Sequence, residues 1–139
     1  MKFSVGDSAE ITKTIEQTDI EAFADVIGDH NPIHVDEEFA KTTRFGRRIA
    51  HGMLGASLIS SVLANKLPGA GSVYLGQTLQ FLAPVFPGDE VTARVTVREV
   101  LTDKPIVKLE TICMNQRKEI VIRGEATVLI HRSHRKESA

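Results

Sequence analysis

The segment from Ala50 to Leu67, AHGMLGASLISSVLANKL, places the strongest constraint on what this chain can fold into. Large apolar residues recur on most sides of a helix in this stretch: Met53, Leu54, Leu58, Ile59, Val62, Leu63 and Leu67. A helix that is apolar almost all round is a buried one, and Pro68-Gly69 ends it. Small residues along it allow close packing: Gly52, Gly55, Ala56 and Ala64. The rest of the chain must therefore wrap around this helix.

The second half of the chain supplies strands for this wrapping. Residues 91–98, VTARVTVR, alternate apolar and polar side chains, which is typical of a half-buried strand. Further strands are predicted over 72–85, 106–115 and 119–130. Gly76 is a candidate β-bulge, and the short connections 102–105 and 116–118 require antiparallel neighbours. We therefore predict an α+β fold in which an antiparallel β-sheet curls around a long central α-helix.

The first half of the chain predicts a short strand over 8–15 and then a helix. Thr18 and Glu21 have the spacing of a capping box at the helix start. Apolar residues then recur at helical spacing as far as Gly28, which suits the C-terminal cap. A shorter helix is predicted over 36–41.

Length and composition bound the class of protein and its partners. The 139 residues fit one domain, which we place at 1–130 and follow with a polar tail at 131–139 that is expected to fray. The 17 basic and 18 acidic residues give a formal net charge of −1, which argues against binding to nucleic acid. The single cysteine, Cys113, leaves no disulfide framework. Without a signal-peptide core or an 18-residue apolar run, the expected location is cytoplasmic, with no membrane association.

The densest polar cluster is the run GDHNPIH at 28–34, where the chain must turn. Pro32 keeps Asn31 out of the α region, so the preceding helix cannot simply continue. Asp29 and His34 lie on either side of this turn, and their side chains could converge on one water molecule. A carboxylate can take a proton from that water, and an imidazole can orient it or relay the proton. On spacing alone, the two could instead be a residue after a helix end and a hydrogen-bonded loop histidine.

Gly52 offers a second chemical feature. It lies near the first turn of the predicted buried helix, where its N–H lacks an intrahelical acceptor and points along the positive end of the dipole. Such a donor can form an oxyanion hole for a thioester carbonyl, whose oxygen gains charge when water attacks the β carbon. Gly52 equally suits close packing, and both interpretations can hold.

Two other chemistries have weaker support in the sequence. Ser60, His51 and Asp29 could form a serine–histidine–aspartate triad, but the chain has no G-x-S-x-G elbow. His30 and Asp36 could join the predicted pair as metal ligands, but no recognised ligand spacing is present. We therefore predict no metal site.

A family resemblance rests on the segments GDHNPIHVDEEFA, RIAHGMLGASLIS, GSVYLGQTLQFLAPVFPGDEV and DKPIVKLET. Over about 5–130 the chain resembles the MaoC-like, (R)-specific enoyl-CoA hydratases, and especially the bacterial hydratases that feed polyhydroxyalkanoate synthesis. The resemblance implies a hot-dog fold, a homodimer with a continuous sheet, and coenzyme A thioester substrates. It also implies roles by position: catalysis for Asp29 and His34, the oxyanion amide for Gly52, and substrate positioning for Ser60 and Asn31.

The predicted reaction is reversible hydration of a trans-2-enoyl-CoA to an (R)-3-hydroxyacyl-CoA, in fatty-acid metabolism or polyhydroxyalkanoate supply. Asp29 and His34 would hold and activate the water, and one of them would return a proton to the α carbon. No metal or redox cofactor is expected, because the thioester is itself the electron sink. Three arginines near the cluster could meet coenzyme A phosphates or form a solvated face: Arg44, Arg47 and Arg48.

Two alternatives remain at this point. In a hot-dog acyl-CoA thioesterase, water would attack the carbonyl carbon instead of the β carbon. A non-catalytic acyl-thioester-binding module would keep the fold and lose the chemistry, and it would have no need to combine Asp29 with His34.

Overall fold

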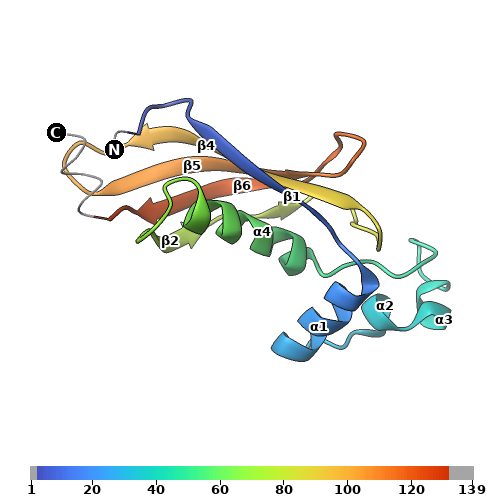
Figure 1. The fold of residues 1–139 in the computed structure, drawn as a ribbon. Coiled ribbons are helices and arrows are strands. Elements are labelled where there is room, and N and C mark those ends of the chain that lie inside the picture. Colours follow the sequence, from blue (N-terminus) through green and yellow to red (C-terminus); the bar gives the residue numbers. More distant parts are fainter. Residues whose placement is uncertain (1–2, 132–139) are drawn as a thin grey trace.

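A six-stranded antiparallel sheet covers one side of a long helix in the computed structural model, which describes residues 3–131 (Figure 1). The strands are β1 (Ser8–Thr14), β2 (Val73–Gln77), β3 (Gln80–Phe81), β4 (Glu90–Val100), β5 (Ile106–Met114) and β6 (Ile120–Leu129). The helices are α1 (Gln17–Ile27), α2 (Pro32–Val35), α3 (Glu37–Ala40) and α4 (Gly52–Asn65). The sheet order is β1-β4-β5-β6-β2, with β3 also paired to β6. The predicted arrangement of sheet and central helix is confirmed.

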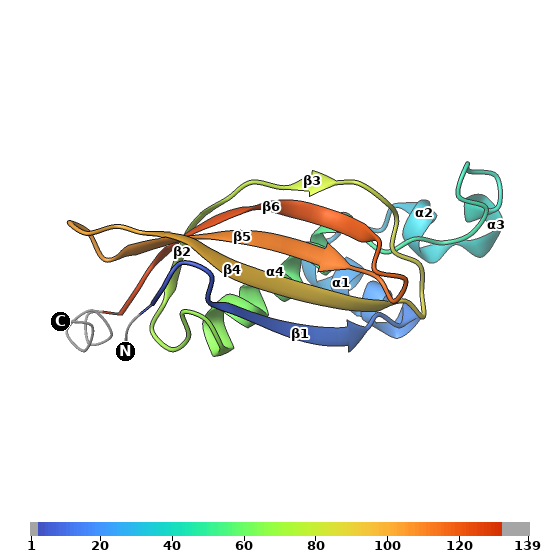
Figure 2. The same cartoon turned by 90° about the horizontal axis from the view of Figure 1, so that it is seen from above.

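The core lies between the sheet and α4. Alternate residues of β4 are fully buried, as the sequence pattern predicts: Val91, Ala93, Val95 and Val97. They share one hydrophobic cluster with Ile59 and Val62 of α4, which are also fully buried. The predicted hairpins joining β4 to β5 and β5 to β6 are confirmed by their antiparallel pairing. Helices α1, α2 and α3 gather at one end of the sheet, where α2 and α3 extend past the strands (Figures 1 and 2).

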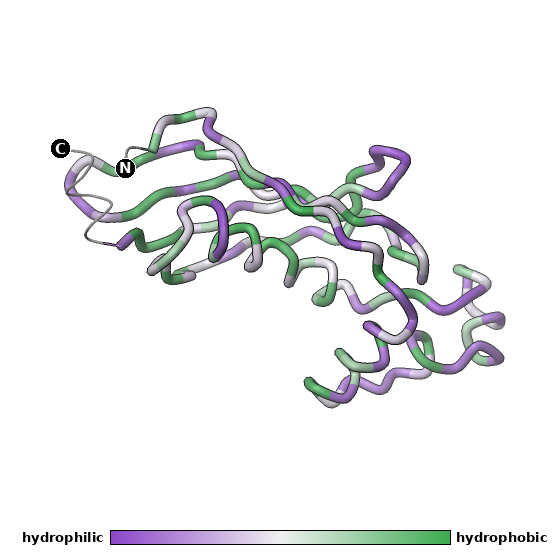
Figure 3. The backbone as a smooth tube through the Cα atoms, in the orientation of Figure 1, coloured by the Kyte–Doolittle hydropathy of each residue, from purple (hydrophilic) through white to green (hydrophobic). Residues whose placement is uncertain are grey.

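One side of α4 is open to solvent, so the prediction of a helix buried all round is wrong for the single chain. Met53 is 54 % exposed, and Ser57, Ser60 and Ala64 are exposed along the same helix. The reason is that one layer of sheet can cover only one side of a helix. The uncovered residues belong to a helix that is hydrophobic or near neutral over most of its length (Figure 3).

The start of α1 differs from its prediction. The capping pair is not Thr18 and Glu21, because Glu16 is extended (φ −93°, ψ 160°) and the helix begins at Gln17. The Glu16 N–H donates to the Asp19 carboxylate at 2.8 Å. At the other end the prediction is confirmed: Gly28 has φ 79°, and its N–H donates to the Ala24 carbonyl.

The single strand predicted over 72–85 is broken into β2 and β3. The pairing of β2 with β6 shifts register between Tyr74 and Gly76, which confirms the bulge predicted there. The break follows at Thr78, whose carbonyl oxygen would lie 1.8 Å from a Cβ atom at position 124. Only a glycine at position 124 leaves room for this carbonyl so close to β6, and the close approach interrupts the ladder between Gln77 and Gln80.

The helices 36–41 and 50–67 predicted from sequence are shorter in the structure, as α3 and α4. The short helix α2 was not predicted. No helix within residues 3–131 is long and apolar enough to cross a membrane. The predicted tail at 131–139 lies outside the described residues except for its first one.

Candidate active site

Helix α2 positions the candidate pair. Pro32 is its first residue, and the Asn31 side-chain oxygen accepts the Ile33 N–H at 3.1 Å. The Gln17 side-chain amide, from the start of α1, donates to the His34 carbonyl at 3.0 Å. The proline turn and this contact between helices therefore bring His34 back toward Asp29, the residue that follows the α1 cap.

Asp29 and His34 face each other, as their positions around the turn predict. The distance from His34 Nε2 to Asp29 Oδ2 is 4.0 Å. His34 Nδ1 lies 2.8 Å from the Ile49 carbonyl oxygen, which only accepts, so Nδ1 carries the proton in the neutral ring. Nε2 therefore turns a lone pair toward a carboxylate. One water molecule placed beside these two acceptors can donate a hydrogen bond to each.

The surroundings of His34 favour its neutral form. The His34 side chain is 11 % exposed, whereas that of Asp29 is 46 % exposed. Burial lowers the pKa of His34 from its usual 6.5, because the charged ring loses hydration. The hydrogen bond to Ile49 and the Asp29 carboxylate oppose this shift, and the neighbouring His51 adds to it. At neutral pH His34 is thus a proton acceptor beside an exposed carboxylate.

His51 was considered from the sequence only as a member of the weakly supported triad, and its place beside the pair was not predicted. It is 3 % exposed and stacks on His34, with ring centroids 3.8 Å apart and an interplanar angle of 27°. Its Nε2 lies 3.0 Å from the backbone carbonyl oxygen of Asp29. The sequence feature that could have pointed to His51 as a site residue is its position directly before Gly52 in the H-G-M segment.

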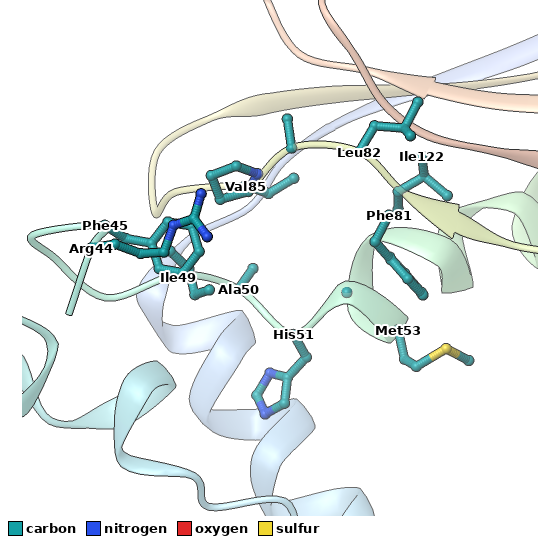
Figure 4. A pocket seen from close by; sticks show the side chains of 13 residues that line it. Arg44, Phe45, Ile49, Ala50, His51, Met53, Phe81, Leu82, Val85 and Ile122 are labelled. Atoms are coloured by element: carbon teal, nitrogen blue, oxygen red, sulfur yellow. The ribbon is translucent and has the colours of Figure 1, made fainter.

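A cavity of about 490 Å³ opens beside the pair, between the start of α4 and the segment from β3 to Val85 (Figure 4). Its lining includes Ile49, His51, Gly52 and Phe81, but not Asp29 or His34. The His51 ring, which stacks on His34, is a lining residue that contacts both members of the pair. A volume in this range is typical of small-molecule sites.

Gly52 is the first residue of α4, as predicted, so its N–H precedes the first intrahelical bond. It lines the cavity, and no acceptor for this N–H is found among residues 3–131. A Cβ atom at this position would lie 2.7 Å from two carbons of the Phe81 ring. Both interpretations of Gly52 thus have support, because the residue offers a free donor and also leaves room for an aromatic ring.

The predicted positioning residues lie apart from the pair or have other partners. Ser60 is eight residues further along α4, about 12 Å at 1.5 Å per residue, and lines a second cavity of about 280 Å³ with Tyr74 and Gln77. The Asn31 side-chain oxygen is occupied in capping α2. A triad of Ser60, His51 and Asp29 is not assembled, because His51 meets the Asp29 backbone and not its carboxylate.

The metal-ligand set considered from sequence is not assembled either. His30 pairs with Asp25 at 2.9 Å, and Asp36 caps α3. Asp29, His34 and His51 do have potential ligand atoms within 4.8 Å of one another. However, a metal lies in the plane of each imidazole that binds it, and two stacked rings direct their lone pairs side by side. These residues therefore do not fit a shared ion.

The three arginines have different surroundings. Arg44 lines the cavity and lies opposite Phe81 in Figure 4. The Arg47 guanidinium covers the Phe86 ring at 3.8 Å. Arg48 pairs with Glu37 at 3.1 Å. Of the three arginines, Arg44 is therefore the one that lines the cavity and has no carboxylate partner within residues 3–131.

Comparison with known proteins identifies the family. A family model described as "MaoC like domain" matches residues 4–121. An (R)-specific enoyl-CoA hydratase of Rhodospirillum rubrum is 50 % identical over 125 residues, covering 90 % of this chain and 86 % of the relative. One from Aeromonas caviae is 49 % identical, covering 89 % and 92 %. A 3-hydroxybutyryl-CoA dehydratase of Methylorubrum extorquens is 45 % identical, covering 91 % and 80 %. The chain belongs to the MaoC-like dehydratase family.

Solved structures agree with this assignment. An (R)-hydratase from A. caviae involved in PHA biosynthesis superimposes with a TM-score of 0.91 at 47 % identity, covering 93 % of this chain and 98 % of that one. An unliganded R-hydratase from Pseudomonas aeruginosa gives 0.88 at 45 % identity, covering 92 % and 82 %. The predicted hot-dog fold is therefore confirmed.

Proposed function

We propose that this chain is an (R)-specific enoyl-CoA hydratase, which reversibly hydrates a trans-2-enoyl-CoA to an (R)-3-hydroxyacyl-CoA. One observation carries the proposal: in a chain half identical to hydratases of that name, the Asp29 carboxylate and the His34 lone pair face each other at 4.0 Å. That geometry suits one water molecule held between two proton acceptors.

The chemistry follows from these positions. Water adds through its oxygen to the β carbon, and its proton passes to the Asp29–His34 pair. The π electrons move through the α carbon to the thioester oxygen, which the Gly52 N–H stabilises. The pair then returns a proton to the α carbon, and the carbonyl re-forms. Atoms and charges balance without an external oxidant or reductant, since the thioester accepts and releases the electron pair.

The experiment uses crotonyl-CoA, a thiol reagent, and an (R)-specific 3-hydroxyacyl-CoA dehydrogenase as a coupling enzyme. We expect loss of the enoyl absorbance without free thiol, and a product that the (R)-specific enzyme oxidises. Free coenzyme A would instead identify the thioesterase alternative. Tight binding of crotonyl-CoA without turnover would identify the non-catalytic binding module. An (S) product would contradict the proposed stereochemistry.

The proposed active form is a homodimer joined at the β2 edge of the sheet. The opposite edge, β1, carries the charged residues Glu10 and Lys13, which protect an unpaired strand. The β2 edge lacks such protection: Val73, Tyr74 and Leu75 are 40–52 % exposed. Pairing two β2 edges would continue the sheet across both chains and bury this apolar surface.

The cytoplasmic location and the domain limits at 1–130 stay predictions.

The proposed carrier is coenzyme A. Arg44 supports this choice, because a guanidinium without a carboxylate partner at a cavity can bind a phosphate group. Ser60 and Asn31 stay proposed positioning residues. Assays with enoyl thioesters of coenzyme A and of acyl carrier protein, at equal concentration and over several acyl lengths, test both the carrier and the chain length.

A further inference from the structure

His51 contacts both members of the candidate pair from a third segment of the chain. Its Nε2 is 3.0 Å from the Asp29 carbonyl oxygen, and its ring stacks on His34 at 3.8 Å. The ring of Phe23, from α1, packs edge-on against it at 5.1 Å and 65°. The buried imidazole thus fills the space between α1, α2 and the start of α4.

Hydrogen-bond direction determines the tautomer of His51. A carbonyl oxygen only accepts, so the His51 Nε2 must carry a proton. Its Nδ1 is buried and has no hydrogen-bond partner among residues 3–131. A proton on Nδ1 would be an unsatisfied buried donor and would place a charge against the His34 ring. The Nε2–H tautomer of His51 pairs with the Asp29 carbonyl oxygen, whereas His34 takes the opposite Nδ1–H form.

We propose that His51 is a positioning residue, which holds the Asp29 carboxylate and the His34 ring in the alignment needed to share one water molecule. The inference rests on the proposed function, because it assigns a role in that same reaction. The Nε2–H donor anchors the Asp29 backbone where it leaves the α1 cap. The stack supports one face of His34, whose ring edge is already held by Ile49.

The expected size of the effect follows from the spacing of the pair. Asp29 Oδ2 and His34 Nε2 are 4.0 Å apart, so a small movement of either would disturb a water molecule shared between them. A misplacement of about 1 Å typically costs about 10²-fold in rate. The His51 Nε2–H points at a backbone carbonyl and Nδ1 has no hydrogen-bond partner among residues 3–131, so the ring can align the pair without a route for proton transfer.

Two variants separate the donor from the ring. His51→Phe keeps an aromatic ring for stacking and removes the donor to Asp29. His51→Gln loses the ring, but its terminal amide can donate from about the same distance along the side chain. We expect the phenylalanine variant to lower kcat by about 10²-fold with little change in KM. The glutamine variant should recover at least tenfold of that loss.

Loss of activity is separated from loss of folding by expressing kcat per folded protein, which circular dichroism measures. A folded His51→Phe variant with wild-type kcat would overturn the inference, and so would an equal loss in both variants. If His51→Phe does not fold, ¹⁵N NMR of histidine-labelled wild-type protein still tests the tautomer. We expect the His51 tautomer with its proton on Nε2, and the Nδ1–H tautomer would overturn the inference. Wild-type protein inactive on crotonyl-CoA would instead contradict the proposed function.

Discussion

His34 Nε2 and Asp29 Oδ2 lie 4.0 Å apart, on opposite sides of the turn that Pro32 begins. Because Ile49 accepts the only proton of the neutral His34 ring, both facing atoms are proton acceptors. Such a pair is unfavourable when empty and favourable around a water molecule. The relationship therefore predicts that the attacking water molecule is held here.

Asp29→Asn and His34→Ala should each lower the hydration rate by about 10²-fold or more, since acid–base groups contribute about 10²–10⁴-fold. Crotonyl-CoA hydration measures the effect, with circular dichroism to verify folding. His30→Ala is the matched control, because His30 lies in the same turn but pairs outward with Asp25. A near-wild-type rate in either folded variant would contradict the proposed mechanism.

The acid limb of kcat/KM should have its midpoint below pH 6.5. Burial lowers the pKa of His34, so the neutral base persists to lower pH than in a free histidine. Activity is then full above pH 6.5 and is lost as pH falls through the lowered pKa. The His34 resonance, titrated by NMR, should give the same midpoint. A midpoint above 6.5 would mean that another group controls the acid limb.

Folding stability should also decrease as the solution is acidified below pH 6.5. The unfolded chain then binds a proton at His34 more readily than the folded one, so protonation favours unfolding. Urea denaturation at pH 7 and at pH 5 measures the difference in the free energy of unfolding. His34→Gln should show a smaller decrease, and equal decreases would assign the effect to other groups.

The oxyanion role of Gly52 is best tested in a background that relieves crowding. A methyl group at this position would meet the Phe81 ring at 2.7 Å, so Gly52→Ala alone mixes crowding with any other effect. Phe81→Ala removes the ring. In that background we expect Gly52→Pro to lower kcat by about 10²–10³-fold, the usual cost of losing one oxyanion donor.

Proline suits this test on structural grounds. Position 52 is the first of α4, where proline is tolerated, and His51 already has the extended conformation (φ −58°, ψ 135°) that a following proline requires. Gly52→Ala in the same background keeps the N–H and should stay near the rate of the background. Similar losses in both double variants would show that Gly52 provides space and not a donor.

Arg44→Ala should raise KM for enoyl-CoA by about fivefold and leave kcat nearly unchanged, since an exposed ion pair contributes up to about 1 kcal/mol. The effect should shrink at high salt because exposed charges are screened. Arg94→Ala is the control, since it removes the same charge from a residue paired with Glu10 on the sheet edge. An equal KM change in the control would reject a phosphate contact at Arg44.

Light scattering should give a mass of about twice the 15.3 kDa of one chain. Leu75→Lys places a charge on the exposed β2 edge and should shift the protein toward monomer. Val26→Lys is the matched control, because Val26 is an exposed apolar residue (82 %) of α1 and does not belong to the β2 strand. A wild-type monomer at micromolar concentration would contradict the proposed dimer.

Much of this protein followed from the sequence alone. The alternation in β4, the glycine cap at Gly28 and the turn at Pro32 depend on backbone preferences of a few neighbouring residues, and each is confirmed. The family resemblance, carried by segments along the whole chain, is confirmed as well. The start of α1 was wrong because Glu16 and Asp19 compete locally with Thr18 and Glu21 for the same capping role.

Other features were decided only by the tertiary structure. The break between β2 and β3 depends on the close approach of the Thr78 carbonyl to Gly124, and the crowding at Gly52 depends on Phe81, far along the chain in both cases. His51 meets Asp29 and His34 from 22 and 17 positions away in the sequence. Side-chain packing between distant segments leaves no periodicity or residue preference in the local sequence, so sequence patterns do not predict it. The sequence by itself therefore determined most of the elements and the candidate pair, whereas packing determined what surrounds that pair.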